Sequence, residues 1–248
     1  MQSTQTGIAS FLAQTDAVGM FVFLLLLLMS AASWTVIAVK AWRYAQGRRQ
    51  SMRVMQGFWE ASSFQQAVSQ LENVGENEPF ASLAASAQRA LAHFQRQGQK
   101  VLGETLDFSE FVTRQLRNAI GRVTARLEWG QTLLASVGST APFVGLFGTV
   151  WGIYHALMSI SGSGQATLDK VAGPVGEALI MTGLGLAVAI PAVLAYNGFT
   201  RRNRVILMEL DGFAHDLHAW LITGARIGSQ SASAPVRQPM QPAAKGAA

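Results

Sequence analysis

The sequence predicts an all-α, polytopic membrane protein with three transmembrane helices, two of them extended into a cytoplasmic helical domain. Half of the 248 residues are hydrophobic and only 13% are charged, whereas soluble domains carry about 25% charged residues. The mean hydropathy is positive, at +0.24. Three intervals are nearly free of charge, and each is long enough to supply the roughly 20 apolar residues that cross a bilayer. Together these observations exclude an ordinary soluble globule.

The spans follow from three intervals, 17–39, 129–168 and 171–200. The first two contain no formal charge, and the third contains one, Glu177. The predicted organisation is, in chain order, a periplasmic N-terminus (1–17), a first transmembrane helix (18–39), a cytoplasmic helical domain (40–130), a second transmembrane helix (131–160), a periplasmic hairpin (161–172), a third transmembrane helix (173–200), a cytoplasmic helix (201–227) and a disordered tail (228–248). A cleaved signal sequence is an alternative for the first span, but residues 1–17 contain no Lys or Arg for its basic start.

The orientation follows from the positions of the cations. Of 19 Lys and Arg residues, twelve lie in 40–128, six in 201–248 and one, Lys170, in the hairpin. The positive-inside rule therefore predicts a periplasmic N-terminus and a cytoplasmic C-terminus. The basic clusters at the ends of the spans are expected to anchor the helices and to contact acidic phospholipid head groups through Arg48, Arg49, Arg201 and Arg202.

The cytoplasmic parts have the pattern of helices. Residues 107–141 contain neither proline nor a turn cluster, so the second span is predicted to continue a longer helix that starts in the cytoplasm. The third span is likewise expected to continue past residue 201. Residues 72–79, ENVGENEP, are predicted to form an exposed turn, and the tail lacks apolar anchors, as disordered segments do.

No enzyme site, cofactor site or metal site is predicted. The chain has no phosphate-binding loop, no dinucleotide fingerprint and no nucleophile elbow. It has no cysteine, which excludes disulfides and cysteine-based metal sites. His215 and His218 share a helix face, but no further candidate metal ligand accompanies them. A solvent-exposed helix face is therefore favoured over a metal site. The basic residues are not interleaved with aromatic ones, so no nucleic acid is expected.

Small residues distinguish the second and third spans from the first. They recur at steps of three or four residues and let helix backbones approach closely, which is how helices associate in lipid. We expect this packing role of Gly145, Gly148, Gly152, Gly176 and Gly183. The second and third spans should therefore face protein, and the leucine-rich first span should face lipid.

Glu177 is the one carboxylate inside a span. A charge near the bilayer centre costs about 3 kcal/mol on insertion scales, so such groups usually face a protein interior or a wet cavity and mark an ion pathway. The alternative is a structural role, because Glu177 lies close enough to the hairpin to form hydrogen bonds near the outer interface. Both interpretations stay open from the sequence.

An antiparallel hairpin centred between residues 165 and 166 places Thr149 and Thr182 at the same depth. Glu177 is then level with Tyr154 and His155, which suggests an outer-side relay. Positions 177 and 182 are about 140° apart on an ideal helix, so they need not share a face. Threonine hydroxyls in membrane helices also often bond to their own backbone, which is the alternative to a polar pathway.

The segments GLFGTVWGIYHAL (145–157) and GPVGEALIMTGLGLAVAIPAVLAYN (173–197), together with three spans and a large cytoplasmic middle, resemble the MotA/TolQ/ExbB proton-channel family. The resemblance implies a bacterial inner-membrane homo-oligomer, a pentamer, around the helices of an ExbD-like single-span partner that carries the proton-accepting Asp. It also implies that the proton motive force energises a TonB-like protein for outer-membrane transport of iron-siderophores and similar cargo. The family's pore residues correspond to Thr149, Glu177 and Thr182.

Two other functions remain compatible with the sequence. A TolQ-like motor subunit would serve envelope integrity with the same chemistry. A passive membrane scaffold would use the small residues only for packing and would not depend on Glu177.

Overall fold

The computed structural model describes residues 16–61, 63–71, 78–97, 108–163 and 168–224, without the side chains of residues 48–50, 52, 53, 97, 159, 160, 162, 163, 168–174 and 177. The predicted N-terminal segment up to residue 15, the hairpin residues 164–167 and the tail 228–248 lie outside the described residues. The described helices are α2 (Ala17–Glu60), α3 (Phe64–Leu71), α4 (Pro79–Gln97), α5 (Phe108–Glu128), α6 (Gln131–Ser163) and α7 (Leu168–Thr223).

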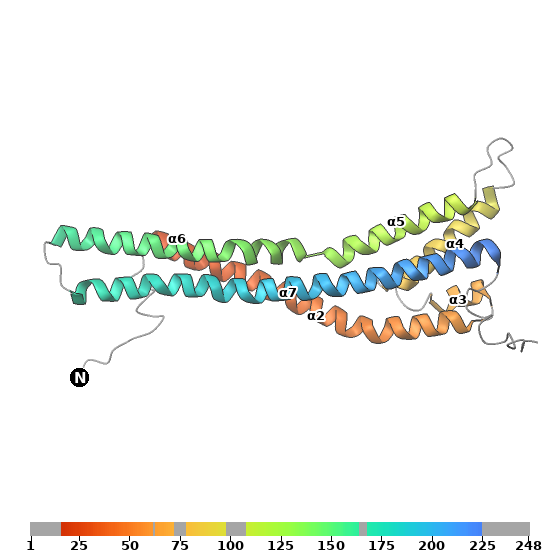
Figure 1. Cartoon of the computed structure of the whole chain (residues 1–248), viewed down its shortest axis with the longest axis horizontal. Coiled ribbons are helices and arrows are strands. Elements are labelled where there is room, and N and C mark those ends of the chain that lie inside the picture. The colour runs from red at the N-terminus through yellow and green to blue at the C-terminus, as the bar shows by residue number, and fades with distance from the viewer. Residues whose placement is uncertain (1–15, 62, 72–77, 98–107, 164–167, 225–248) are drawn as a thin grey trace, which may run out of the picture.

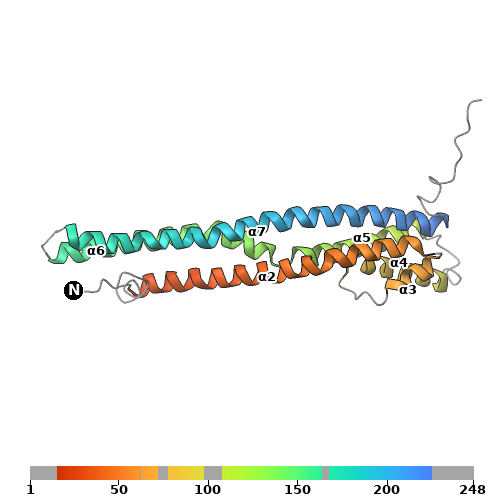
Figure 2. The same ribbon diagram turned by 90° about the horizontal axis from the view of Figure 1, so that it is seen from below.

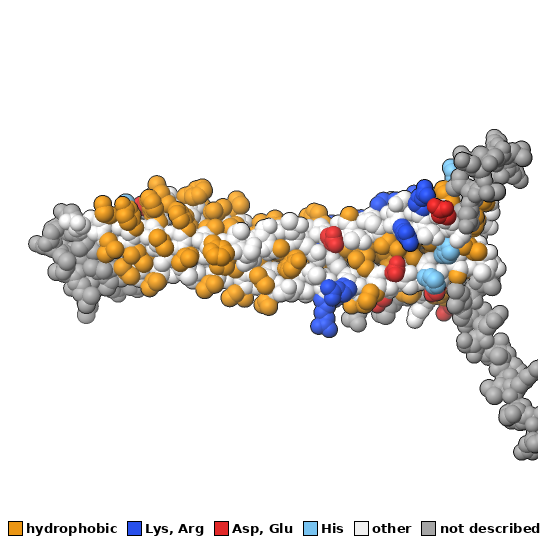
Figure 3. Space-filling view, turned by 45° about the horizontal axis from the view of Figure 1, so that its top comes forward, with side chains coloured by type: hydrophobic (Ala, Val, Ile, Leu, Met, Phe, Trp, Pro, Cys, Tyr) orange, Lys and Arg blue, Asp and Glu red, His pale blue; other side chains and the backbone are white. Residues whose placement is uncertain are grey.

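The helices form one elongated bundle (Figures 1 and 2). It has an apolar half and a polar half. We call α6 with residues 17–39 of α2 and 168–200 of α7 the apolar half. The polar half comprises α3, α4 and α5 with residues 41–60 of α2 and 201–223 of α7. Exposed hydrophobic side chains cover the first half, and charged side chains appear on the second (Figure 3). Three helical segments are long and apolar enough to cross a membrane, which confirms the predicted fold class.

The apolar half is built on the α6–α7 hairpin, with α2 packed along one side of it. Asp16 starts α2 by accepting a hydrogen bond from the Gly19 amide at 2.8 Å, as an N-cap residue does. The prediction that the first span faces lipid is only half right. One face of α2, which includes Val22, Leu26 and Val36, is buried against α6 and α7, whereas Leu24, Leu27 and Leu28 are exposed.

The predicted continuous helix from residue 107 into the second span is wrong. The chain breaks between α5 and α6 at Trp129 and Gly130, and Gly130 has a φ of +75°. A left-handed glycine just after a helix is a common helix stop. A Cβ at Gly130 would also lie 2.7 Å from Cγ1 of Val36, so α2 leaves no space for a side chain. The two spans that extend into the polar half are therefore the first and the third, through α2 and α7.

The polar half has an aromatic core. Phe58 of α2 is fully buried, and its ring lies edge-on to Phe213 and Trp220 of α7 at 5.0 and 5.7 Å between ring centroids. Edge-to-face pairs at these distances add to the stabilisation from burial. Because α2 and α7 reach this core without a break, the core fixes their ends relative to each other.

Glu78 corrects the predicted exposed turn at 72–79. Residues 72–77 lie outside the described residues, but Glu78 is only 6% exposed. Its carboxylate caps α4 by accepting the Ala81 amide at 2.6 Å and also accepts the Ser51 hydroxyl of α2 at 2.8 Å. Burial raises the pKa of Glu78 above its usual value, and the hydrogen bonds from Ala81, Ser51 and Phe80 offset part of that rise.

The buried carboxyl of Glu78 should make the polar half more stable as the pH falls. Because its pKa is higher in the folded than in the unfolded protein, its contribution is fully present below the unfolded pKa and is lost as the pH rises through the folded pKa. We expect the thermal midpoint, followed by tryptophan fluorescence, to which Trp59 and Trp220 of the polar half contribute, to show this dependence in the wild type and to lose it in Glu78→Gln.

Glu110→Gln is the matched control for this measurement, because the Glu110 side chain is 71% exposed. It should leave the pH dependence of the midpoint as it is in the wild type. A Glu78→Gln protein with the wild-type pH profile would contradict the prediction.

Candidate functional site

The candidate site is a pair of threonines between α6 and α7. The hydroxyl oxygens of Thr149 and Thr182 lie 2.5 Å apart, at one depth, as the hairpin arithmetic predicts. The Thr149 hydroxyl also lies 3.1 Å from the Gly145 carbonyl and 3.0 Å from the Ala178 carbonyl, both of which it can donate to. With one proton to give, it shares that proton between the two carbonyls and accepts the hydrogen bond from Thr182.

The two threonines differ in their access to the surface. Thr149 is 6% exposed, and Thr182 is half-buried. The bond from Thr149 to Gly145 is the local backbone bond that threonines often form in helices, whereas the contacts with Ala178 and Thr182 cross to α7. Thr149 therefore joins the two helices and holds the hydroxyl of Thr182.

Glycines allow the helices to approach this closely. A Cβ at Gly145 would lie 2.6 Å from the Met181 carbonyl oxygen, and a Cβ at Gly152 would lie 2.9 Å from the Ala178 Cβ. A Cβ at Gly148 would meet Val22 of α2 at 3.0 Å. At each of these three glycines, a side chain would come within about 3 Å of a neighbouring helix.

Two of the five predicted glycines have no such contact with the described residues. A Cβ at Gly176 or Gly183 would meet no atom of the described residues within 4 Å. The glycine of α7 that packs is Gly185, whose added Cβ would lie 2.7 Å from the Ala141 carbonyl oxygen. The pattern of small residues indicates which helices pack together. Which of their glycines lie at the contact depends on the rotation of each helix against its partner.

Glu177 lies in α7, one residue before Ala178, and its side chain is outside the described residues. Because α7 is an α-helix throughout, positions 177 and 182 are about 140° apart around its axis. Thr182 is turned toward Thr149 on α6, so position 177 belongs to a different side of α7.

The predicted outer-side residues His155 and Tyr154 are both exposed on α6. The Nδ1 atom of His155 lies 4.0 Å from Oδ2 of Asp16, the same oxygen that accepts the Trp151 indole N–H at 2.6 Å. Asp16 thus caps α2 and ties it to α6. The signal for this contact was the isolated acid at the start of the first span, which the sequence interpretation did not use.

Among the residues predicted to contact lipid head groups, Arg201 and Arg202 are exposed at the boundary between the two halves. The guanidinium of Arg202 lies 5.2 Å from the ring centroid of Tyr44 in α2. The side chains of Arg48 and Arg49 are outside the described residues.

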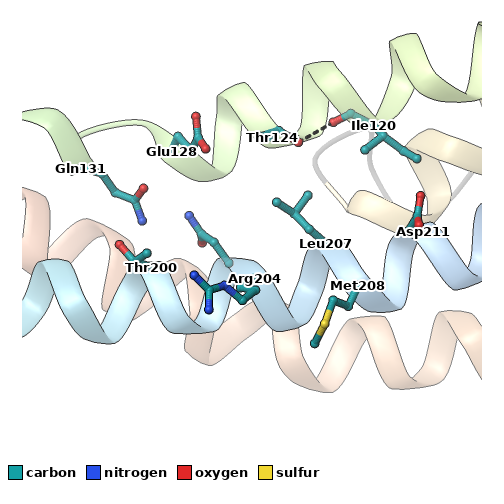
Figure 4. Close-up of a pocket in the computed structure, with 10 residues that line it drawn as sticks. Ile120, Thr124, Glu128, Gln131, Thr200, Arg204, Leu207, Met208 and Asp211 are labelled. Atoms are coloured by element: carbon teal, nitrogen blue, oxygen red, sulfur yellow. Dashed lines mark hydrogen bonds between the residues drawn. The ribbon is translucent and has the colours of Figure 1, made fainter.

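A groove of about 470 Å³ lies beside the break between α5 and α6 (Figure 4). Its lining residues are Ile120, Thr124, Glu128, Gln131, Thr200, Asn203, Arg204, Leu207, Met208 and Asp211. Within the described part of the chain, Nε2 of Gln131 and Oγ1 of Thr200 are buried without a hydrogen-bond partner. The groove residues could not be predicted from the sequence, because single polar residues at a span end have no distinctive pattern.

The described residues contain no group of three or more His, Cys, Asp or Glu side chains that could hold a metal ion. Nε2 of His218 instead lies 3.2 Å from the Ser109 hydroxyl of α5. This contact connects His218 of α7 to α5.

These features define a class of protein: a polytopic helical membrane protein with a hydrogen-bonded polar pair buried between two glycine-packed spans. A family model described as the MotA/TolQ/ExbB proton channel family matches residues 86–212. The chain is 48% identical over 213 residues to the biopolymer transport protein ExbB of Xanthomonas campestris pv. campestris, covering 85% of this chain and 84% of that protein.

Other relatives agree with this match. The biopolymer transport protein ExbB of Neisseria gonorrhoeae is 41% identical over 207 residues, covering 84% of this chain and 93% of its own length. The Tol-Pal system protein TolQ of Pseudomonas aeruginosa is 33% identical over 217 residues, covering 87% and 93%. The chain belongs to the MotA/TolQ/ExbB proton channel family, and it is an integral membrane protein.

Proposed function

We propose that this chain is the ring-forming subunit of an inner-membrane proton-driven motor of the ExbB–ExbD type. The motor uses the proton motive force to energise a TonB-like protein for outer-membrane transport of iron-siderophores and similar cargo. The observation that carries the proposal is the threonine pair buried between two packed spans in a chain that belongs to a proton channel family. Over most of the chain, the identities to the ExbB proteins of Xanthomonas campestris and Neisseria gonorrhoeae, 48% and 41%, exceed the 33% identity to the TolQ protein of Pseudomonas aeruginosa, which favours this function over envelope integrity.

In this proposal several copies, a pentamer, surround the helix of an ExbD-like single-span partner. The N-terminus is periplasmic and the C-terminus cytoplasmic, because the cations gather in the polar half and the tail. At Gly176 and Gly183 a Cβ would meet no described residue of the same chain within 4 Å, which leaves α7 open to a neighbouring helix in the ring. Arg48, Arg49, Arg201 and Arg202 contact acidic phospholipid head groups at the inner surface.

The proton pathway uses Glu177 and Thr182, with Thr149 supporting Thr182 from behind. Because positions 177 and 182 are on different sides of α7, different neighbours in the ring contact them. His155 and Tyr154 form the outer-side relay. One proton crossing 100 mV releases about 2.3 kcal/mol, which is enough to bias a movement between subunits. The chain acts as the stationary ring and performs no covalent chemistry.

A deletion strain tests the function. We expect it to lose iron-siderophore uptake and to keep its resistance to detergents, and the full chain supplied in trans should restore uptake only while the membrane potential is intact. A detergent-sensitive strain with normal uptake would identify a TolQ-like subunit instead. Purification of the complex from the host should yield a single-span partner with an intramembrane Asp, which a passive scaffold would not require.

A further inference from the structure

The break between α5 and α6 lies where the apolar and polar halves meet. Helices α2 and α7 pass this level without interruption, whereas the third chain segment stops at Glu128 and restarts at Gln131. The last carbonyl groups of a helix have no amide partner within it, so the end of α5 must find donors elsewhere. Those donors come from the two uninterrupted helices.

The carbonyl oxygen of Leu127, near the end of α5, accepts two side-chain hydrogen bonds. Nζ of Lys40 in α2 donates at 2.6 Å, and Nδ2 of Asn203 in α7 donates at 2.9 Å. The Tyr44 hydroxyl, one turn after Lys40, donates to Oδ1 of the same Asn203. Lys40, Tyr44 and Asn203 therefore close a ring of contacts around one carbonyl, and we call these three residues the junction clamp.

Lys40 is unusual for a lysine at the end of a span. Such a side chain normally extends its ammonium group into the head-group region, but Lys40 is only 4% exposed. No Asp or Glu oxygen of the described residues is in salt-bridge contact with it. The charge is instead stabilised by the carbonyl end of α5 and by the rings of Tyr44 and Phe199, whose centroids lie 5.9 and 5.5 Å from Nζ.

The groove beside the break gives α5 and α6 room to change their angle. Asn203 belongs both to the junction clamp and to the lining of the groove, and Glu128 and Gln131 on either side of the break also line it (Figure 4). Nε2 of Gln131 and Oγ1 of Thr200 make no hydrogen bond to other described residues in the observed arrangement. A buried polar atom without a partner is costly, so a second arrangement that pairs these atoms is favoured on that count.

We propose that the break at Trp129 and Gly130 is a hinge, and that the junction clamp holds it in the observed position. The hinge lets α5 change its angle to α6, which stays packed along α7, while α2 and α7 remain straight. Lys40 and Asn203 are positioning residues in this device. That the hinge moves during transport rests on the proposed function, whereas the clamping of the hinge does not.

Distances between spin labels test the clamp in the full-length complex. The chain has no cysteine, so labels can be introduced at chosen sites without background. Arg117 on α5 and Ser139 on α6 are exposed and lie on either side of the break. Ala187 and Glu209 are exposed on unbroken α7 with the same sequence separation, about 33 Å of helix, and form the control pair. Excess unlabelled protein restricts the measurement to distances within one chain.

Lys40→Met should broaden the distance distribution across the break and shift its mean, and should leave the distribution on α7 unchanged. Lys40→Arg should keep the wild-type distribution, because a guanidinium can still donate to Leu127. Arg96→Met, which removes an exposed cation from α4, should change neither pair. Asn203→Leu combined with Lys40→Met should broaden the distribution further.

An unchanged distribution across the break in the double variant would overturn the proposal. So would equal broadening of the α7 pair, which indicates general loosening, or a Lys40→Arg distribution as broad as that of Lys40→Met. The distances are measured without any transport assay. They therefore test the junction clamp even if the chain does not serve iron-siderophore uptake.

Discussion

Replacing Glu177 with alanine should abolish iron-siderophore uptake while the complex still assembles. The residue is the one formal charge in the third span, and removing it takes away the group that we propose exchanges protons with the pathway. Glu177→Gln separates the two roles of the carboxyl. A structural hydrogen-bonding role tolerates Gln, whereas a proton relay does not, because an amide does not take up and release protons in this range.

Thr182→Val should reduce uptake in the same way as Glu177→Ala. Valine keeps the shape of threonine but removes the hydroxyl that lies 2.5 Å from the Thr149 hydroxyl. The matched control is Thr140→Val in the same hairpin, since Thr140 is exposed and donates only to the Ser136 carbonyl of its own helix. Normal uptake in both Glu177→Gln and Thr182→Val, with intact complex, would leave the passive scaffold as the better explanation.

The geometry of the threonine pair was predictable because it depends on little more than helix rise. In an antiparallel hairpin of two helices, residues at equal distances from the turn share a depth, whatever the side chains around them. The number of spans was predictable for a similar reason, since about 20 apolar residues are needed for each crossing. Both predictions rest on properties of the solvent and the backbone alone.

Other features depend on tertiary neighbours and could not be predicted. The break at Gly130 has no proline near it, and a single glycine also occurs inside helices, as Gly198 does in α7. What sets Gly130 apart is its φ of +75° and the nearby Val36 of α2, which occupies the space a side chain would need. The burial of Lys40 likewise depends on a carbonyl 87 positions later in the chain.

The role of Thr149 could not be predicted from the sequence either. The sequence presents it as equivalent to Thr182, and only the rotation of α6 about its axis makes it a buried connector. The same rotation separates Gly145, which touches α7, from Gly183, which touches nothing in the chain. The spacing of small residues predicts which side of a helix packs. Which of the neighbouring small residues make the contact can be seen only with the partner helix in place.

Gly145→Ala should destabilise the apolar half and separate the threonine pair. The new Cβ would lie 2.6 Å from the Met181 carbonyl oxygen and 3.0 Å from the Gly185 Cα, and neither backbone atom can rotate away. Helices α6 and α7 must therefore move apart, which costs about 1–3 kcal/mol as other overpacked interiors do. Because spans associate mainly through close packing, lower thermal stability in detergent should accompany a loss of uptake.

Gly198→Ala is the matched control for Gly145→Ala. It makes the same substitution in α7 at a position where a Cβ meets nothing within 4 Å, so it gains the higher helix propensity of alanine, up to about 1 kcal/mol, without a clash. The comparison thus isolates the contact between α6 and α7 from the backbone effect. If Gly145→Ala proved as stable as Gly198→Ala, the backbones of the two helices would not be in contact at this level. The depth match of Thr149 and Thr182 would then lack the support that holds the two hydroxyls together.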